Sequence, residues 1–150
     1  MHGRNSFSFT EEERLALKTY LEVGGFIFAD SICSSKEFTE SFREEMANIL
    51  GQSLKPIPAN HPIWNDRNFL FKIDSVTLRR KRGDTGKFDE VKGPPELEGH
   101  TINDRLAVIF SPHDLSCAME SSTVSQCDGY IRDDAERIGV NVLLYRLRVE

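Results

Sequence analysis

Two short apolar runs constrain the fold of this 150-residue chain more than any other feature of its sequence. The first covers residues 26–29 (Phe-Ile-Phe-Ala), and the second covers residues 106–110 (Leu-Ala-Val-Ile-Phe). Neither run contains a charge, and both are bounded by polar residues or glycine, so each predicts a strand that is buried on both faces. Such strands are typical of parallel sheets covered by helices, which predicts an α/β fold.

Amphipathic helices are expected around the first apolar run. A capping box formed by Thr10 and Glu13 predicts that a helix begins there, because each side chain can accept a bond from the other residue's backbone N–H. The glycine pair at positions 24 and 25 is predicted to end this helix. Its buried stripe is predicted to contain Leu15, Leu17, Tyr20 and Leu21.

A second helix is predicted directly after the first run. Phe38, Phe42 and Met46 recur every four residues, whereas most residues between them are polar or charged, so one stripe is apolar. A last helix is predicted to begin at Asp133 or Asp134. The buried residues of this last helix are predicted to be Ile138, Val142 and Tyr145.

The middle of the chain is predicted to be less regular. Prolines confine any strand at residues 54–58 to a sheet edge, because proline has no backbone donor. Residues 68–76 have a strand-like composition and precede a basic run at residues 79–82, which we interpret as a solvated loop in preference to a phosphate or anionic-partner site. Residues 83–95 are predicted to be an insertion or mobile loop, and residues 116–129 a further loop.

Composition limits the class of protein. The chain is 39% hydrophobic and 29% charged, which is typical of a globular protein, and its length suits one domain over residues 1–150. A net charge of −5 argues against a dedicated nucleic-acid-binding protein. The sequence has no membrane segment and no signal-peptide core, so the chain as written is predicted to be cytoplasmic. Its cysteines would be reduced thiols there.

Polar side chains follow both apolar runs. Asp30, Cys33 and Ser34 come after the first run, and His113 and Asp114 come after the second. The carboxyl ends of neighbouring parallel strands meet at one edge of a sheet, so we expect these side chains at a common rim. The candidate ligand-binding residues of the chain are Asp30, Ser34, His61 and Asp114.

Cys33 and His113 are the candidate catalytic residues. Cys33 is predicted to precede a helix, whose N–H groups and dipole can stabilise a thiolate, and His113 could act as its base. The alternative interpretation is a structural Cys33 and a hydrogen-bonded His113 beside a helix-capping Asp114. We prefer this alternative, because no nucleophile signature surrounds Cys33.

Two further interpretations of the cysteines stay open. Cys33, His113, Cys117 and Cys127 offer the ligand types of a zinc site, although the paired spacing typical of such sites is absent. In an oxidising compartment, Cys117 and Cys127 could instead form a disulfide that closes a short loop. No cofactor is predicted, since the sequence contains no Walker loop, dinucleotide fingerprint or zinc-protease helix.

Several stretches together resemble a bacterial family that is known as a domain of unknown function, DUF4159. They span nearly the whole chain and comprise residues 9–14, 20–30, 38–46, 60–63, 97–99, 105–117 and 139–141. The resemblance implies a three-layer, flavodoxin-like parallel sheet related to the class I glutamine amidotransferase fold.

The resemblance also implies that a strand–helix–strand portion precedes residue 1 in family members and is missing here. The strand at residues 26–29 would then have an exposed edge, which a protein partner or a second copy would cover. Many relatives resemble secreted or membrane-attached proteins. The chain would therefore be periplasmic or envelope-associated if its natural start lies upstream.

The resemblance does not extend to a catalytic set. Amidotransferases need Gly-x-Cys-x-Gly and a downstream His-x-Glu pair, whereas residues 31–35 are Ser-Ile-Cys-Ser-Ser and His113 is followed by Asp114 and Leu115. We therefore predict a non-catalytic binding or interaction domain of amidotransferase-like fold. The alternatives are a Cys33-dependent hydrolase or amidotransferase-like enzyme with His113 as base, and a structural Cys/His metal site.

Overall fold

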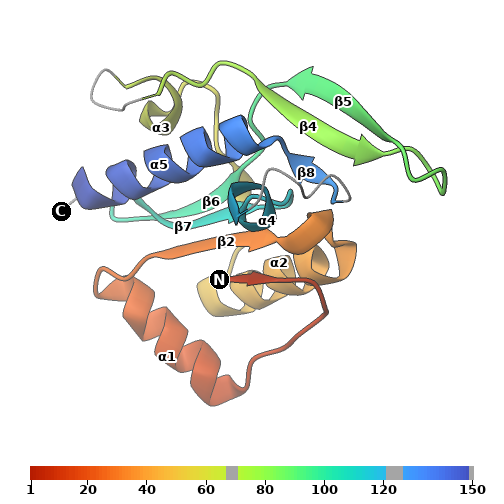
Figure 1. The fold of residues 1–150 in the computed structure, drawn as a ribbon. Helices are drawn as coiled ribbons and strands as arrows, with labels where there is room; N and C mark the ends of the chain where they lie inside the picture. Colours follow the sequence, from red (N-terminus) through yellow and green to blue (C-terminus); the bar gives the residue numbers. More distant parts are fainter. Residues whose placement is uncertain (67–70, 121–126, 149–150) are drawn as a thin grey trace.

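The computed structural model describes residues 1–66, 71–120 and 127–148, which form a mixed α/β fold (Figure 1). A five-stranded sheet has the order β1-β2-β7-β6-β3, and a three-stranded sheet has the order β5-β4-β8. The strands are β1 (His2–Gly3), β2 (Ile27–Ser31), β3 (Lys55–Pro56), β4 (Val76–Lys81), β5 (Phe88–Gly93), β6 (Glu98–Ile102), β7 (Arg105–Ser111) and β8 (Gly129–Tyr130). The helices are α1 (Glu11–Glu22), η1 (Ile32–Ser34), α2 (Lys36–Leu50), α3 (Pro62–Asn65), α4 (Ser116–Glu120) and α5 (Arg132–Arg148).

The two apolar runs form neighbouring parallel strands, as the sequence predicted. β2 pairs with β7 so that Ile27 lies opposite Val108 and Phe28 opposite Ile109. Both strands therefore end at the same edge of the sheet, which brings the polar residues that follow them to one rim.

The larger sheet is only partly parallel, which corrects the expectation of a parallel sheet throughout. β1, β2 and β7 are parallel, whereas β6 and β3 are antiparallel to their neighbours. The cause is a tight turn between β6 and β7, in which Asn103 and Asp104 have φ of 50° and 61°. Positive φ at both central residues is typical of a two-residue hairpin, and a hairpin can only join antiparallel strands.

Helices pack on both faces of this sheet (Figure 1). Val108 and Phe110 of β7 belong to the core beneath α2, which also contains the predicted stripe Phe38, Phe42 and Met46. Ile109 points the other way, because side chains alternate along a strand. It packs in the core beneath α5, whose buried residues include Ile138, Val142 and Tyr145 as predicted.

Helix α1 begins at the predicted capping box, but only Leu17 and Leu21 of its predicted buried stripe pack against the core. The Thr10 side chain accepts from Glu13 N and Thr10 N donates to Glu13 Oε2. Leu21 is buried, whereas Leu15 and Tyr20 are 66% and 48% exposed. The reason is that α1 lies at the outside of the domain beyond α2, where only one edge of its surface meets the core (Figure 1).

The basic run is a strand, which corrects its interpretation as a loop. Residues 79–81 belong to β4, and part of the predicted loop 83–95 forms β5. Opposite charges face each other across this hairpin, with Arg79 opposite Glu90 and Arg80 opposite Asp89, and such pairs stabilise antiparallel strands. The strand predicted at residues 68–76 is wrong over residues 71–75, which form no strand, since β4 begins at Val76; positions 68–70 lie outside the described residues.

The edge beside β2 is occupied by the short strand β1. His2 lies opposite Asp30 and Gly3 opposite Ser31, while the amino group of Met1 donates to Phe28 O at 2.8 Å. A strand–helix–strand portion before residue 1, and association through this edge, stay predictions. In the part of the chain that the structure describes, the helices are all too short or too polar to cross a bilayer.

The packing of Phe42 gives a test of this core. Its side chain is fully buried and its ring stacks on Phe110 at a centroid distance of 4.5 Å. We expect Phe42→Ala to lower the free energy of unfolding by about 3–5 kcal/mol, because it removes buried apolar surface and leaves a cavity. Urea unfolding followed by circular dichroism would measure the change. Leu15→Ala is the control, expected to change stability by about 0.5 kcal/mol or less.

Candidate functional site

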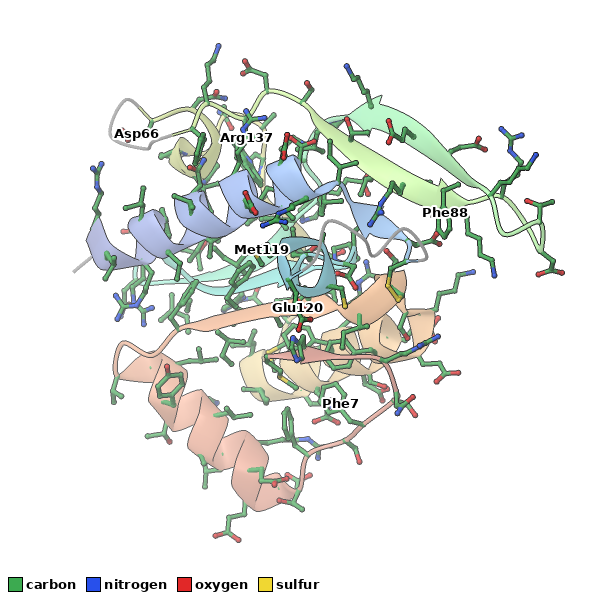
Figure 2. All side chains as sticks on the ribbon, in the orientation of Figure 1. Phe7, Asp66, Phe88, Met119, Glu120 and Arg137 are labelled. Carbon is green, nitrogen blue, oxygen red and sulfur yellow. A yellow bond between two sulfur atoms is a disulfide. The ribbon has the colours of Figure 1, made fainter. Side chains whose placement is uncertain are left out.

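The rim at the carboxyl ends of β2 and β7 is built around two buried carboxylates. Asp30, at the end of β2, accepts at Oδ2 from Leu115 N at 3.0 Å and from the backbone N and hydroxyl of Ser116, each at 2.9 Å. Ser116 is the first residue of α4 and Leu115 precedes it, so Asp30 caps a helix that follows the neighbouring strand. Figure 2 draws the side chains of the described residues, and its labels Met119 and Glu120 mark α4 beside β2.

Asp114 makes the reciprocal connection. It follows β7, is 1% exposed, and accepts at Oδ2 from Cys33 N, in the turn after β2, at 2.5 Å. Its other oxygen accepts from Cys117 N at 2.9 Å, which confirms the helix-capping interpretation of this residue. Because each strand end supplies a carboxylate to the backbone that follows the other strand, the turns after β2 and β7 are held together.

The structure joins Cys33 to Cys127 in a disulfide across 94 residues of sequence. This corrects both the expectation of reduced cysteines and the alternative pairing of Cys117 with Cys127. The physical reason is that β8 and the segment before it return to the rim, as the bridge between Asp114 and Gly129 indicates. In the disulfide neither sulfur is a thiol, so Cys33 has no nucleophile in this form.

Cys117 is the free cysteine of the rim. Burial and the neighbouring Asp114 carboxylate raise the pKa of its thiol to about 11, because both disfavour a thiolate. It is therefore a thiol at neutral pH and a poor nucleophile.

His113 lies in a separate chain of hydrogen bonds. Its Nδ1 is 3.4 Å from Ser34 Oγ, and its Nε2 is 2.7 Å from Glu96 Oε2. Ser34 Oγ also donates to Asp128 O at 3.1 Å, and the Tyr130 hydroxyl holds the backbone of Glu96 through two bonds. His113 is thus directed away from the sulfur atoms, so the four ligands of the predicted zinc set do not converge.

Ser34 and His113 open onto a cavity of about 470 Å³, which we name the rim pocket. Four cationic side chains line it, two from α2 and two from β4: Lys36, Arg43, Arg79 and Arg80. The other lining residues are Thr39, Glu40, Pro112 and Asp128. Glu96 was not among the residues predicted from the sequence, and the basic run was interpreted as solvated. The positions of these side chains depend on the fold of the β4–β5 hairpin and of the segment that follows it, which the local sequence does not determine.

His61 lies elsewhere. Its Nδ1 accepts from Ile63 N at 3.2 Å at the start of α3, and its ring packs against Tyr145. Burial lowers the pKa of His61, because it disfavours the imidazolium. Among the candidate ligand-binding residues, the structure therefore brings Asp30, Ser34 and Asp114 to the rim and leaves His61 outside it.

Comparison with models of known families matches residues 1–147 to DUF4159, described as a domain of unknown function. A search of curated proteins found no match for this chain.

The disulfide gives a test of how the rim is held together. We expect Cys33→Ser to lower the free energy of unfolding by about 2–5 kcal/mol, because a bond across 94 residues restricts the unfolded chain strongly. Urea unfolding with a metal chelator present would measure the change, and reduction of the unmodified protein should have the same effect. Cys117→Ser is the matched control. Identical unfolding of the unmodified protein with and without reductant would contradict this assignment.

Proposed function

The chain belongs to the DUF4159 family, and from this premise we propose that the domain binds an anionic ligand in the rim pocket. The observation that carries the proposal is the gathering of four cations, from two separate elements, around one cavity at the carboxyl ends of parallel strands. This position is where ligands bind in open α/β sheets. The function is accordingly one of binding, as the sequence predicted, with no chemistry required.

The charge of the pocket lining favours the binding of an anion. The lining residues comprise four cations and the carboxylates of Glu40 and Asp128, an excess of positive charge in a chain whose net charge is −5, and two further carboxylates pair with two of these cations from outside the lining. Arg43 is held by Glu98 at 3.0 Å, and Arg80 lies 3.8 Å from Glu96. Glu98 takes two N–H donors of Arg43, so Arg43 adds mainly its charge and its remaining donors, whereas Arg80 is held only at the longer distance; guanidinium groups bind carboxylates and phosphates through their N–H donors.

The relation to the class I glutamine amidotransferase fold belongs to the same proposal. Its support is the parallel trio of strands β1, β2 and β7, with α2 and α5 packed on opposite faces. A site at the carboxyl end of such a trio is compatible with that relation, although the antiparallel strands β6 and β3 extend the sheet differently.

Anion binding is tested by removing cations from both sides of the pocket. We expect inorganic phosphate and citrate, measured by isothermal titration calorimetry at constant ionic strength, to bind the unmodified protein. The double variant Lys36→Gln, Arg80→Gln should bind at least roughly tenfold more weakly, because each lost charge-assisted bond contributes about 1.5 kcal/mol or more.

The control for this experiment removes the same number of cations outside the pocket. Lys18→Gln combined with Lys92→Gln leaves the lining residues unchanged. Equal binding by the two double variants would mean that any affinity comes from general surface charge, and the proposal would be wrong.

A second candidate function is hydrolysis or acyl transfer with Ser34 as nucleophile. This hypothesis replaces that of a Cys33-dependent enzyme. The observation that favours it is the row of hydrogen bonds from Ser34 through His113 to Glu96. Ser34 has φ of 54° in the turn between β2 and α2, and such strained positions are frequent at functional sites. The substrate class would be an ester with an anionic group.

A fluorophosphonate reagent tests this second candidate. The Ser34 hydroxyl would turn from Asp128 O to His113 Nδ1, and its oxygen would bond to phosphorus while fluoride leaves and His113 takes the proton. Mass spectrometry should then find the label on Ser34, and His113→Gln should slow labelling by about 100-fold or more. Ser34→Ala should abolish it, whereas Ser35→Ala is the matched control. Absence of label on Ser34 would contradict the catalytic function and leave anion binding as the proposed function.

A further inference from the structure

The cysteines of the chain, at positions 33, 117 and 127, all lie against Asp114. Cys33 and Cys117 contact its carboxylate through their backbone N–H groups, and Cys127 Sγ lies 3.6 Å from its Oδ2. The ligand atoms of Cys33, Asp114 and Cys127 are within 4.8 Å of one another. The fold has thus brought two sulfurs and a carboxylate together from two distant parts of its sequence.

We infer that Cys33, Cys127 and Asp114 bind a Zn²⁺ ion when the disulfide is reduced. Zinc binds thiolates at about 2.3 Å and carboxylate oxygens at about 2.0–2.2 Å, so in a tetrahedral site two sulfurs lie about 3.8 Å apart and a sulfur and an oxygen about 3.6 Å apart. Cys127 Sγ already lies 3.6 Å from Asp114 Oδ2, and the two sulfurs can move apart to the distance that zinc requires once the bond between them is broken. Two thiolates, one carboxylate and a water molecule would complete a four-coordinate site.

The chemistry of the exchange balances. A dithiol reductant transfers two electrons and two protons to the Cys33–Cys127 bond, so that one S–S bond breaks, two thiols form, and the reductant becomes a disulfide. Zn²⁺ then replaces the two thiol protons, which are released to solvent. Without the ion, two thiolates beside Asp114 would repel one another and that carboxylate, whereas Zn²⁺ compensates two of the three negative charges.

The surroundings suit a metal site. The N–H groups of Cys33 and Cys117 each hold one oxygen of Asp114, which fixes the orientation of the carboxylate as outer-shell partners do in metal sites. Asp114 and Cys127 are buried, whereas Cys33 also lines a cavity of about 400 Å³ together with Arg4, Asn5 and Lys36. The proposed site therefore borders a cavity on the side of Cys33.

The zinc inference does not rest on the proposed anion binding, because different side chains carry the two proposals. The disulfide and the zinc ion would make the same connection, between the turn after β2 and the segment before β8, under oxidising and reducing conditions respectively. His113 has no part in it, since both ring nitrogens face other side chains.

Zinc binding to the reduced protein tests the inference. The full chain would be reduced with a phosphine, dialysed against Zn²⁺ without chelator, and analysed for bound metal by atomic emission. We expect one tightly bound zinc ion per chain in the reduced protein and none in the oxidised protein. Titration with Co²⁺ should also produce the thiolate-to-cobalt charge-transfer band. A reduced protein that retains no zinc would overturn the inference.

Single substitutions identify the ligands. We expect zinc binding to be weakened by roughly 100-fold or more in each of the variants Cys33→Ser, Cys127→Ser and Asp114→Asn. Loss of a direct ligand should weaken binding at least as much as loss of an outer-shell partner, which weakens it by about 10–100-fold. Cys117→Ser and His113→Gln are matched controls and should keep full affinity. Loss of binding in a control but not in Asp114→Asn would contradict the ligand set. The comparison of oxidised with reduced unmodified protein stays decisive if a variant fails to fold.

Discussion

The exchange of two buried carboxylates between neighbouring strand ends is the interaction on which the rest of this structure depends. Asp30 of β2 holds the backbone that follows β7, and Asp114 after β7 holds the backbone that follows β2. A buried carboxylate is tolerated only when its oxygens accept hydrogen bonds, and here each one satisfies N–H groups that would otherwise be unpaired in the turn. The cost of burying either charge is therefore offset only when both turns adopt this arrangement.

Parallel pairing of β2 with β7 makes that exchange possible. The strands are far apart in sequence, and their pairing is favoured by the apolar faces that they give to α2 and α5. The hydrophobic core thus fixes the register, and the register places Asp30 opposite Ser111, close to the residues it caps. Packing of the core therefore determines which residues lie at the rim. The polar contacts of the rim then hold in place the turn that contains Cys33 and Ser34.

The sequence predicted those features that depend on local pattern. The apolar runs, the capping box at Thr10 and the stripe of Phe38, Phe42 and Met46 are each determined within a few residues, and each was confirmed. The exposure of Leu15 was not predictable, because it depends on how much of α1 meets the core. The hairpin at residues 103 and 104 was readable in principle, since asparagine and aspartate tolerate positive φ.

The candidate site divides in the same way. Asp30, Cys33, Ser34, His113 and Asp114 could be placed at one rim, because they directly follow two recognisable strands. Their disulfide and hydrogen-bond partners could not be placed there from the sequence. Cys127 and Glu96 reach the rim through the path of β8 and the segment before β6, which no short-range pattern encodes.

The disulfide lies next to the rim pocket, because Cys33 and Cys127 directly precede two residues that line it, Ser34 and Asp128. Lys36 and Arg43 enter the pocket from α2, while Arg79 and Arg80 enter from β4 of the other sheet. Asp128 connects these halves, since its backbone oxygen accepts from Ser34 and its side chain accepts from Lys81 N in β4 at 2.5 Å. The bond from Cys33 to Cys127 lies one residue away on both sides. Any change in that bond therefore acts directly on the spacing between the two groups of cations, so ligand affinity and the state of the sulfurs should be coupled through the same two peptide segments.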